Sequence, residues 1–485
     1  MTTREATDTG AAAATPGWRD LLGRRHGAVA TALAGGVALH AVNVYLATTV
    51  LPSVIEDIGG ARLYAWATTV FVVASVLGSV LASAVLARTG PRPAYRWSAA
   101  ALLVGTVVCA LAPTMAVLLV GRAVQGLGGG LLFALCYSVV RIVFEEALWP
   151  RAMALVSAMW GVATLVGPAL GGAWAQARLW RGAFWTLVPL LVLCAVLGAR
   201  RLPGRGGEPG SVRLPWGAVG LLSAAVLVVS AASVARSPSV NAAGVLVAVV
   251  LLCVWARHER GATVRVLPRA AFGPDRRLRL AYVTMAGLVV ASCVEVFVPF
   301  FGQRLQGLGP LGAGYLGAAM AAGWTLGSIV LSGATARRGP VVATAPLFCL
   351  TGLAMLVAVS PVRSSGAGVV SAVTAGLVLL GWGVGAAWPH LLTDVLRLSG
   401  DADQDVAGAS TTTVQLTATA FGSAVAGMVA NASGFADPAT TADAARHLYA
   451  VFLVPAAVAL IGAVLVSGTR SGKRVPAGKR VPAGE

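Results

Sequence analysis

Charged residues are scarce in this chain of 485 residues: they make up 11% of it, whereas hydrophobic residues make up 57%. Soluble domains carry about 25% charged residues, so the deficit is too large for a surface that faces only water. Acidic residues are scarcest, with 18 Asp and Glu against 36 Lys and Arg. This composition excludes an ordinary soluble protein and favours one embedded in a lipid bilayer.

The chain also lacks the patterns of catalytic, metal and cofactor sites. Its six cysteines fall within apolar runs, without the spacing of a zinc or redox site. We find no GxxxxGK[ST] loop and no constellation of Ser, His and Asp, which disfavours an enzyme or an ATP-driven pump. The basic residues are scattered in short breaks and form no single patch, so we expect no nucleic-acid partner. We expect no cofactor and no metal.

What the chain does have is a succession of apolar runs, each close to the roughly 20 residues that a helix needs to cross a bilayer. We predict an all-α integral membrane protein with fourteen transmembrane helices. They fall at 27–53, 64–87, 97–114, 116–140, 152–177, 183–199, 215–235, 241–256, 280–302, 311–335, 341–359, 368–390, 409–431 and 448–468.

Arginine positions indicate the orientation in the membrane. Fourteen spans put both termini on one side. With the N-terminus inside, 28 of the 36 Lys and Arg residues fall in inside segments and seven in outside segments. Loops rich in positive residues stay in the cytoplasm. We therefore predict a multi-pass protein of the cell (inner) membrane, in contact with the lipid bilayer, with both termini cytoplasmic.

Two longer inside segments divide the spans into six, two and six (6+2+6). We predict two six-helix bundles with a two-helix insertion between them. The predicted order is a cytoplasmic tail (1–26), a six-helix bundle (27–199), a linker (200–214), two extra helices (215–256), a basic loop (257–279), a second six-helix bundle (280–468) and a disordered basic tail (469–485).

Only two charged residues lie well inside the predicted spans, Arg122 and Glu295. A charge within a membrane is costly, so each is a functional candidate. Burial favours the neutral form of a carboxylate, which suits Glu295 to load and release a proton. The alternative for Glu295 is a structural carboxylate paired with a neighbouring helix.

Two spans are rich in glycine. The fourth has Gly126 and Gly130 at the GxxxG spacing, which allows close helix packing. In the fifth, Pro168 removes a backbone hydrogen bond and should kink the helix among glycines. A kinked helix with a small-residue face can act as a seal or pivot.

These segments resemble the major facilitator superfamily, in its fourteen-helix drug:proton antiporter branch of multidrug-efflux-like exporters. Gly121, Arg122, Gln125, Gly126 and Gly128 match motif B (GRxxQGxG), and the fifth span is similar to the antiporter motif C (GxxxxxGPxxGG). The segments Trp180–Phe184 and Val296–Gln303 are similar to that branch as well. The resemblance covers about 27–468, and motif C implies an exporter.

The resemblance also implies roles for individual residues. Proton coupling would fall to Glu295 and Arg122. The substrate cavity would be lined by His40, Asn43, Arg122, Gln125, Glu295, Trp382, Trp388 and His390. The seal between helices would be formed by Gly161, Gly167, Pro168, Gly171 and Gly172.

The chain departs from the family pattern at two places. In the cytoplasmic motif A, Arg88, Gly90 and Arg92 remain, but Ala87 replaces the acidic residue. The acid common in the first span is also absent, with Asn43 in its place. Both departures shift the expected proton coupling onto Glu295.

We therefore expect a secondary active exporter of small hydrophobic or cationic molecules, of the drug or antibiotic efflux type, that exchanges them for protons by alternating access and works as a monomer. One alternative is an uncoupled or other-ion-coupled facilitator or exporter of a single natural product. Another is a membrane sensor or scaffold on the same fold that transports nothing.

Overall fold

The computed structural model describes residues 18–145, 148–204, 214–235, 237–331, 333–334, 337–400 and 403–468. Regular structure within these ranges is helical, without strands. The tail predicted at 469–485 lies outside them, as do residues 1–17 and most of the linker. The α-helices are α1 (Trp18–Leu22), α2 (Gly27–Ile58), α3 (Trp66–Thr89), α4 (Pro91–Ala110), α5 (Met115–Val143), α6 (Trp149–Gln176), α7 (Trp180–Arg201), α8 (Trp216–Ser233), α9 (Pro238–Gly261), α10 (Arg277–Ser292), α11 (Val298–Arg304), α12 (Pro310–Leu331), α13 (Arg338–Val359), α14 (Ala367–Leu398), α15 (Gln404–Ala432) and α16 (Thr441–Gly468). Three short 3₁₀-helices are η1 (Ala61–Leu63), η3 (Arg269–Phe272) and η4 (Cys293–Phe297).

Thirteen helical segments within the described ranges are long and apolar enough to cross a membrane. They correspond to every predicted span except 97–114, which falls in α4. That helix starts at Pro91, and Arg92 and Arg96 in its first two turns lower its mean hydropathy. The fourteenth span therefore stays a prediction.

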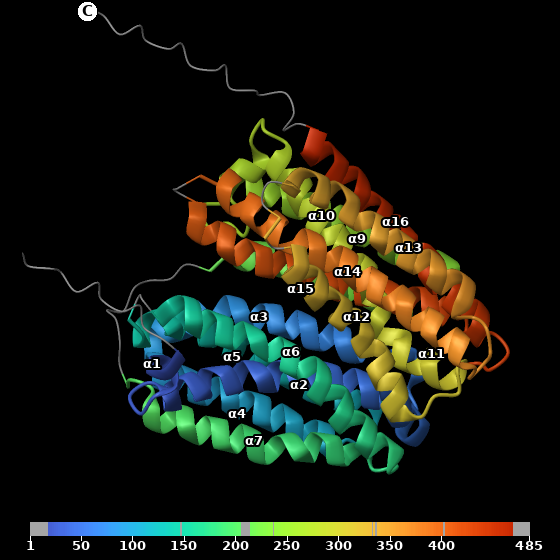
Figure 1. Cartoon of the computed structure of the whole chain (residues 1–485), viewed down its shortest axis with the longest axis horizontal. Coiled ribbons are helices and arrows are strands. Elements are labelled where there is room, and N and C mark those ends of the chain that lie inside the picture. The colour runs from blue at the N-terminus through green and yellow to red at the C-terminus, as the bar shows by residue number, and fades with distance from the viewer. Residues whose placement is uncertain are drawn as a thin grey trace, which may run out of the picture.

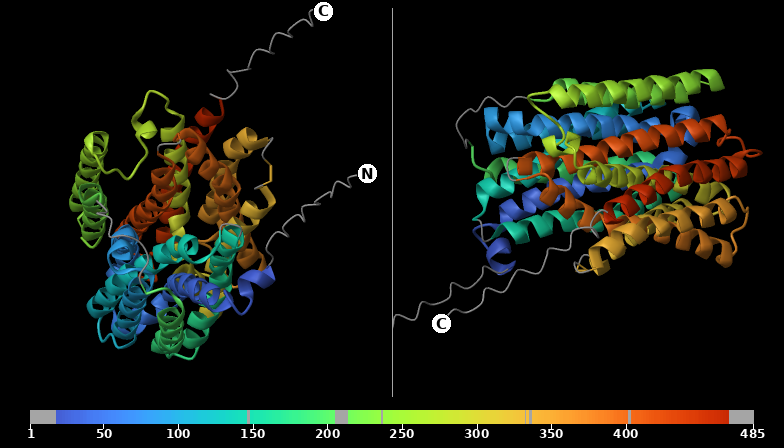
Figure 2. Two further views of the ribbon diagram at one scale, coloured as in Figure 1. Left: turned by 90° about the vertical axis from the view of Figure 1, so that its left-hand side faces the viewer. Right: turned by 90° about the horizontal axis from the view of Figure 1, so that it is seen from above.

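The helices form two bundles that lie side by side (Figure 1). In the N-terminal bundle, α2 to α7, both α3 and α4 pack on α5, and α2 packs on α6. In the C-terminal bundle, α10 to α16, both α12 and α13 pack on α14, and α16 packs on α10 and α13. The helices α8 and α9 pair with each other, and α8 also contacts α3 and α15 (Figure 2). The two bundles converge where α11 lies and diverge toward α1 (Figure 1).

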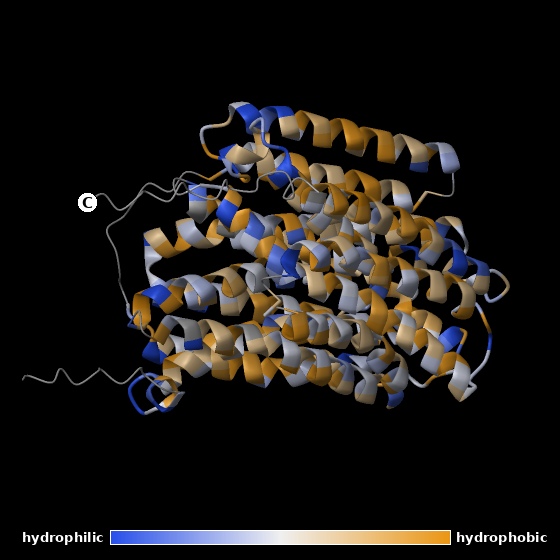
Figure 3. Ribbon diagram, turned by 45° about the horizontal axis from the view of Figure 1, so that its top comes forward, coloured by the Kyte–Doolittle hydropathy of each residue, from blue (hydrophilic) through white to orange (hydrophobic). Residues whose placement is uncertain are grey.

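Apolar residues cover the lengths of the helices, and hydrophilic residues gather at their two ends (Figure 3). Several large apolar side chains point outward, such as Leu246 and Val250 of α9, which are 65% and 53% exposed. Exposed apolar faces on helices whose backbone groups are bonded internally fit the hydrocarbon of a bilayer.

Glycines bring helices within each bundle into backbone contact. A Cβ atom at Gly126 or Gly130 of α5 would lie 2.2 or 2.1 Å from carbonyl oxygens of α3, which confirms the close packing expected from their spacing. Gly381 and Gly385 of α14 approach α12 in the same way, each with 1.9 Å to a carbonyl oxygen. Each bundle thus has one helix pair locked by two glycines four residues apart.

Candidate functional site

Arg122 is the centre of a buried hydrogen-bond network, the Arg122 network, that joins α2, α3, α4 and α5. Its Nε donates to the carbonyl oxygen of Ala67 at 3.0 Å, and its Nη1 donates to Asn43 Oδ1 and, at 3.0 Å, to Gln125 Oε1. Gln125 Nε2 then donates to Thr106 Oγ1 at 2.9 Å. These acceptors are all neutral, so dipoles hold the guanidinium, which pairs with no carboxylate in the described part of the chain.

Aromatic rings border the Arg122 network on the side of His40. The Phe71 ring lies 4.0 Å from the Arg122 Cζ atom, in a cation–π contact, and stacks on the His40 ring at 5.5 Å. The rings of Phe133 and Trp160 also contact His40, at 5.5 and 6.2 Å between centroids. This group of rings offers π faces that can bind a cation.

Two buried polar atoms beside these rings, His40 Nδ1 and Asn43 Nδ2, have no hydrogen-bond partner among the described residues. Buried polar atoms in proteins are nearly always bonded. Both atoms can therefore bond to a substrate or to water. The structure thus brings together four of the predicted cavity residues: His40, Asn43, Arg122 and Gln125.

Glu295 lies at a break in a membrane-spanning segment. The α-helix α10 ends at Ser292, the 3₁₀-helix η4 carries Glu295, and α11 begins at Val298. The cause is Pro299, which has no N–H to donate to the carbonyl oxygen of residue 295 four positions earlier. The Val298 N–H bonds that oxygen instead. A 3₁₀ stretch within a helix often marks a functional hinge.

Glu295 forms no salt bridge with any residue that the structure describes. Its side chain is partly accessible, although both neighbours in sequence are buried. It lies within electrostatic range of Tyr45 on α2, in the other bundle. The alternative of a structural ion pair therefore finds no support in the described part. Thr284 of α10 packs against Gly462 of α16.

The glycines of α6 bring it close to both bundles. A Cβ at Gly167 would lie 2.6 Å from Tyr45 Cβ of α2, and one at Gly171 would lie 3.0 Å from the Leu46 oxygen. A Cβ at Gly172 would lie 2.5 Å from Leu311 Cα of α12, in the other bundle. Pro168 lies inside α6, beside Gly314 of α12. Gly161, by contrast, faces open space, with no atom within 4 Å.

Contacts between the bundles gather at the end where they converge, here called the closed end. Arg304 of α11 bonds Glu56 of α2 at 2.9 Å. The Tyr64 ring stacks on Phe297 at 4.9 Å and meets Phe300 and Phe435 at 5.8 Å. The exposed ion pair, the aromatic cluster and the Gly172 contact all join the halves, and Asn431 of α15 donates to the Arg62 oxygen at 2.9 Å.

The predicted cavity residues of α14 lie apart from the Arg122 network. Trp388 packs on Trp324 of α12, with 5.4 Å between ring centroids. His390 is buried, and its Nε2 lies 2.8 Å from the Leu331 oxygen. Arg338 of α13 donates to the His390 oxygen at 2.8 Å and pairs with Asp394. Trp382 packs through its backbone against Gly327 of α12.

The remaining motif A residues, Arg88, Gly90 and Arg92, lie where α3 meets α4, and this junction is bonded to the N-terminal bundle. Gly90 has φ +81°, a conformation that favours glycine. Arg92 Nε donates to the Leu202 oxygen at 2.8 Å, at the end of α7. Arg88 is exposed. No bond from this junction to the C-terminal bundle is present in the described ranges.

Comparison with known proteins decides the family. The sequence model of the Major Facilitator Superfamily matches residues 33–427. The chain belongs to the Major Facilitator Superfamily. It is 40% identical to a probable multidrug-efflux transporter of Mycobacterium tuberculosis (strain H37Rv), covering 98% of this chain and all of that protein. It is 23% identical to a multidrug efflux pump of Staphylococcus aureus (strain N315), covering 59% of this chain and 64% of that protein.

Solved structures agree on the fold. A crystal structure of a POT family transporter in complex with 5-aminolevulinic acid superposes with a TM-score of 0.65 at 13% identity, covering 90% of this chain and 96% of that one. The chain is therefore a multi-pass membrane transporter of the superfamily, with small-molecule substrates, rather than an enzyme.

Sequence reasoning missed several members of the site. Thr106, Phe71 and Phe133 are ordinary residues of apolar runs, and only the folded packing brings them to Arg122 and His40. Glu56 and Arg304 did carry a signal, because they are opposite charges at the outer ends of two predicted spans.

Proposed function

We propose that this transporter exports small hydrophobic or cationic molecules in exchange for protons. The observation that carries the proposal is Glu295, a carboxylate without a cationic partner among the described residues, placed at a helix break between the bundles. Without a fixed counter-charge, it can bind either a proton or a cationic substrate. Because the two compete for one carboxylate, binding of one releases the other.

Alternating access would follow from the contacts between the bundles. Glu56, Arg304, Tyr64 and Gly172 hold the closed end, and the bundles diverge at the other end. Positive residues favour placing the diverging end in the cytoplasm, with both termini there and fourteen spans including α4. The structure then corresponds to a state open toward the cytoplasm, from which a substrate would be loaded.

The N-terminal bundle would supply the substrate contacts. The aromatic rings around His40 suit apolar or cationic molecules, and His40 Nδ1 and Asn43 Nδ2 can hydrogen-bond them. Export rather than import is supported by the motif C glycines and by the multidrug-efflux name of the relative that is 40% identical. We propose that the chain works as a monomer, as an efflux pump that can confer antibiotic resistance.

In a second candidate function, transport is not coupled to protons. Asn43, an amide, occupies the place of the first-span acid, and the acceptors of the Arg122 network are neutral. If Glu295 is a substrate contact only, the protein is an uncoupled or other-ion-coupled exporter of a single compound.

Transport measurements in proteoliposomes under an imposed pH gradient distinguish the two candidate functions. Ethidium movement and lumenal pH are followed together in the wild type, in Glu295→Gln and in Asp443→Asn. Asp443 is exposed in α16 and serves as the acidic control. Coupled antiport predicts that ethidium and protons move in opposite directions, and that only Glu295→Gln abolishes the exchange. Ethidium transport that ignores the gradient would favour the second candidate.

A further inference from the structure

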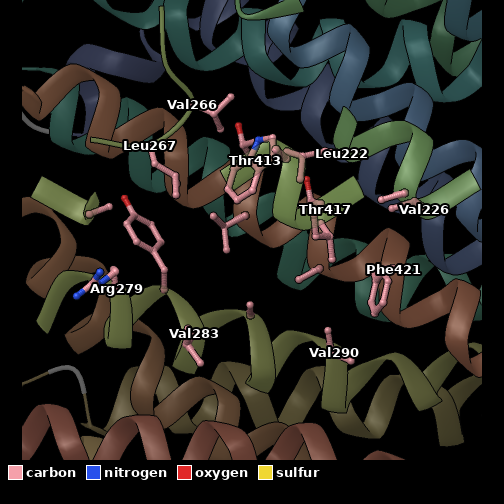
Figure 4. A pocket seen from close by; sticks show the side chains of 18 of the residues that line it. Leu222, Val226, Val266, Leu267, Arg279, Val283, Val290, Thr413, Thr417 and Phe421 are labelled. Atoms are coloured by element: carbon pink, nitrogen blue, oxygen red, sulfur yellow. The ribbon is translucent and has the colours of Figure 1, made fainter. Parts of the chain in front are cut away.

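Beside α8 and α9 lies an apolar cavity that takes no part in the proposed transport site. Its volume is about 380 Å³. Its walls come from α8, α9, α10, α15 and the loop between α9 and α10. Figure 4 shows Arg279 at one end and Phe421 at the other, with apolar side chains between them.

A buried acid shapes one wall of the cavity. Glu259, near the end of α9, has no exposed surface. Its carboxylate accepts hydrogen bonds from the backbone N–H groups of Val266 and Leu267, each at 3.1 Å. Both of those residues line the cavity. The loop is thus fixed over the space by a charge-assisted bond, so the wall is a built feature of the fold.

Two polar atoms in the largely apolar lining have no partner in the described part of the chain. They are the indole Nε1 of Trp255 and the hydroxyl Oγ1 of Thr417, and both are buried. An indole N–H can only donate a hydrogen bond. An occupant that fits this lining must therefore be largely apolar and must carry an acceptor for the indole, and the threonine hydroxyl can donate to a second acceptor.

The rim adds a charge requirement. Arg279 is exposed at the end of the cavity and forms no ion pair with the residues that the structure describes. The loop and helix start around it are strongly basic, with seven arginines between residues 257 and 279. Arginine binds phosphate oxygens well, and basic pockets between helices at the cytoplasmic face bind anionic lipid headgroups.

We propose that this cavity binds an anionic glycerophospholipid of the cytoplasmic leaflet. The acyl chain would lie along α10 and α15, the ester oxygens would accept hydrogen bonds from Trp255 and Thr417, and the phosphate would lie at Arg279. From Arg279 to Val290 the cavity follows α10 for about 16 Å at ~1.5 Å per residue, which suits an extended chain rather than a compact molecule. In this proposal, α8 and α9 form one wall of a lipid-binding site whose other wall is the C-terminal bundle.

Photo-crosslinking of the full-length protein tests this lipid site. The protein is reconstituted with phosphatidylglycerol that carries a diazirine on one acyl chain, and labelled peptides are mapped by mass spectrometry. We expect labelling around Val283 and Val290 of α10 and around Thr417 and Phe421 of α15. Arg279→Gln should lower it by about tenfold, the loss expected for one phosphate contact. Arg276→Gln is the matched control, because Arg276 is exposed in the same loop but does not line the cavity.

A second variant, Ala286→Trp, fills the cavity and should remove the label while size-exclusion profiles stay normal. If that variant misfolds, the comparison of Arg279→Gln with Arg276→Gln still decides. Equal labelling by a phosphatidylcholine probe would overturn recognition of the anionic headgroup. Displacement of the label by ethidium would overturn the lipid assignment, because the cavity would then be a substrate site. Failure of proton coupling would leave the lipid result untouched.

Discussion

Gly172 of α6 is the point where a single added carbon should change which end of the transporter is open. A Cβ at this position would lie 2.5 Å from Leu311 Cα and 3.0 Å from Leu311 Cδ1. Real Cβ atoms do not approach others below 3.0 Å. Because Leu311 belongs to the other bundle, Gly172→Ala strains only the state in which the closed end is closed.

The cost of such overpacking is about 1–3 kcal/mol. The strain disappears when the bundles separate at that end, so the equilibrium between the two access states should shift toward opening. A bias of this size corresponds to about a 5- to 150-fold change in their ratio. No contact within the N-terminal bundle has to break, so the protein should still fold.

The assay measures how often the closed end opens. Thr49, 1% exposed and packed beside Gly171, is replaced by cysteine in a variant whose six native cysteines have been removed. A membrane-impermeant maleimide is added outside right-side-out vesicles, and the labelling rate is followed. Gly172→Ala should raise the rate severalfold or more. Gly161→Ala is the matched control, since nothing lies within 4 Å of its Cβ position.

Equal labelling rates in the two alanine variants would refute this reasoning. The closed end would then tolerate the extra carbon by a local adjustment. A slower rate in Gly172→Ala would mean that the methyl group fills space and stabilises the closed end, the opposite of the expected sign.

Three further predictions test other parts of the structure. Gly126→Ala should lower the thermal unfolding temperature, because a Cβ there meets a carbonyl oxygen of α3 at 2.2 Å. Gly161→Ala should leave that temperature equal or raise it slightly. Similar unfolding temperatures for both variants would contradict the close glycine packing of α5 on α3. Arg122→Lys should abolish ethidium transport in proteoliposomes although the charge is kept. A lysine ammonium lacks the planar guanidinium that donates hydrogen bonds to both Ala67 and Asn43. Retained transport would show that the Arg122 network is not needed for the mechanism. Glu56→Gln and Arg304→Gln should each speed maleimide labelling by at most about fivefold, because an exposed ion pair contributes roughly 0–1 kcal/mol. High salt should mask the difference. A larger effect would show that these two side chains hold the closed end through more than their mutual ion pair.

Much of the architecture follows from local sequence because a bilayer requires long apolar helices. Thirteen spans could be predicted in this way. The exception, α4, shows the limit of the approach, since Arg92 and Arg96 make its composition ambiguous although it packs between α5 and α7. The grouping of Arg122, Asn43 and Gln125 in one cavity was implied by the family resemblance, and it agrees with the rarity of polar residues inside apolar helices.

Other features needed the folded chain. Pro299 did signal a break, but a proline within an apolar run can kink, shift or end a helix, so the 3₁₀ turn at Glu295 could not be read from it alone. The lipid cavity depends on apolar side chains from five separate segments, and their meeting leaves no local signal.

The distribution of glycines has a consequence for how mutations would act on this protein. Inside each bundle, the α3–α5 and α12–α14 pairs touch through backbone atoms, which cannot adjust without moving a whole helix. Between the bundles, the ion pair of Glu56 with Arg304 and the rings around Tyr64 are side-chain contacts that can rotate away. Substitutions within a bundle should therefore reduce the amount of folded protein. Substitutions of these side chains between the bundles should leave that amount unchanged and alter the turnover rate, so variation that tunes transport has most room at the closed end.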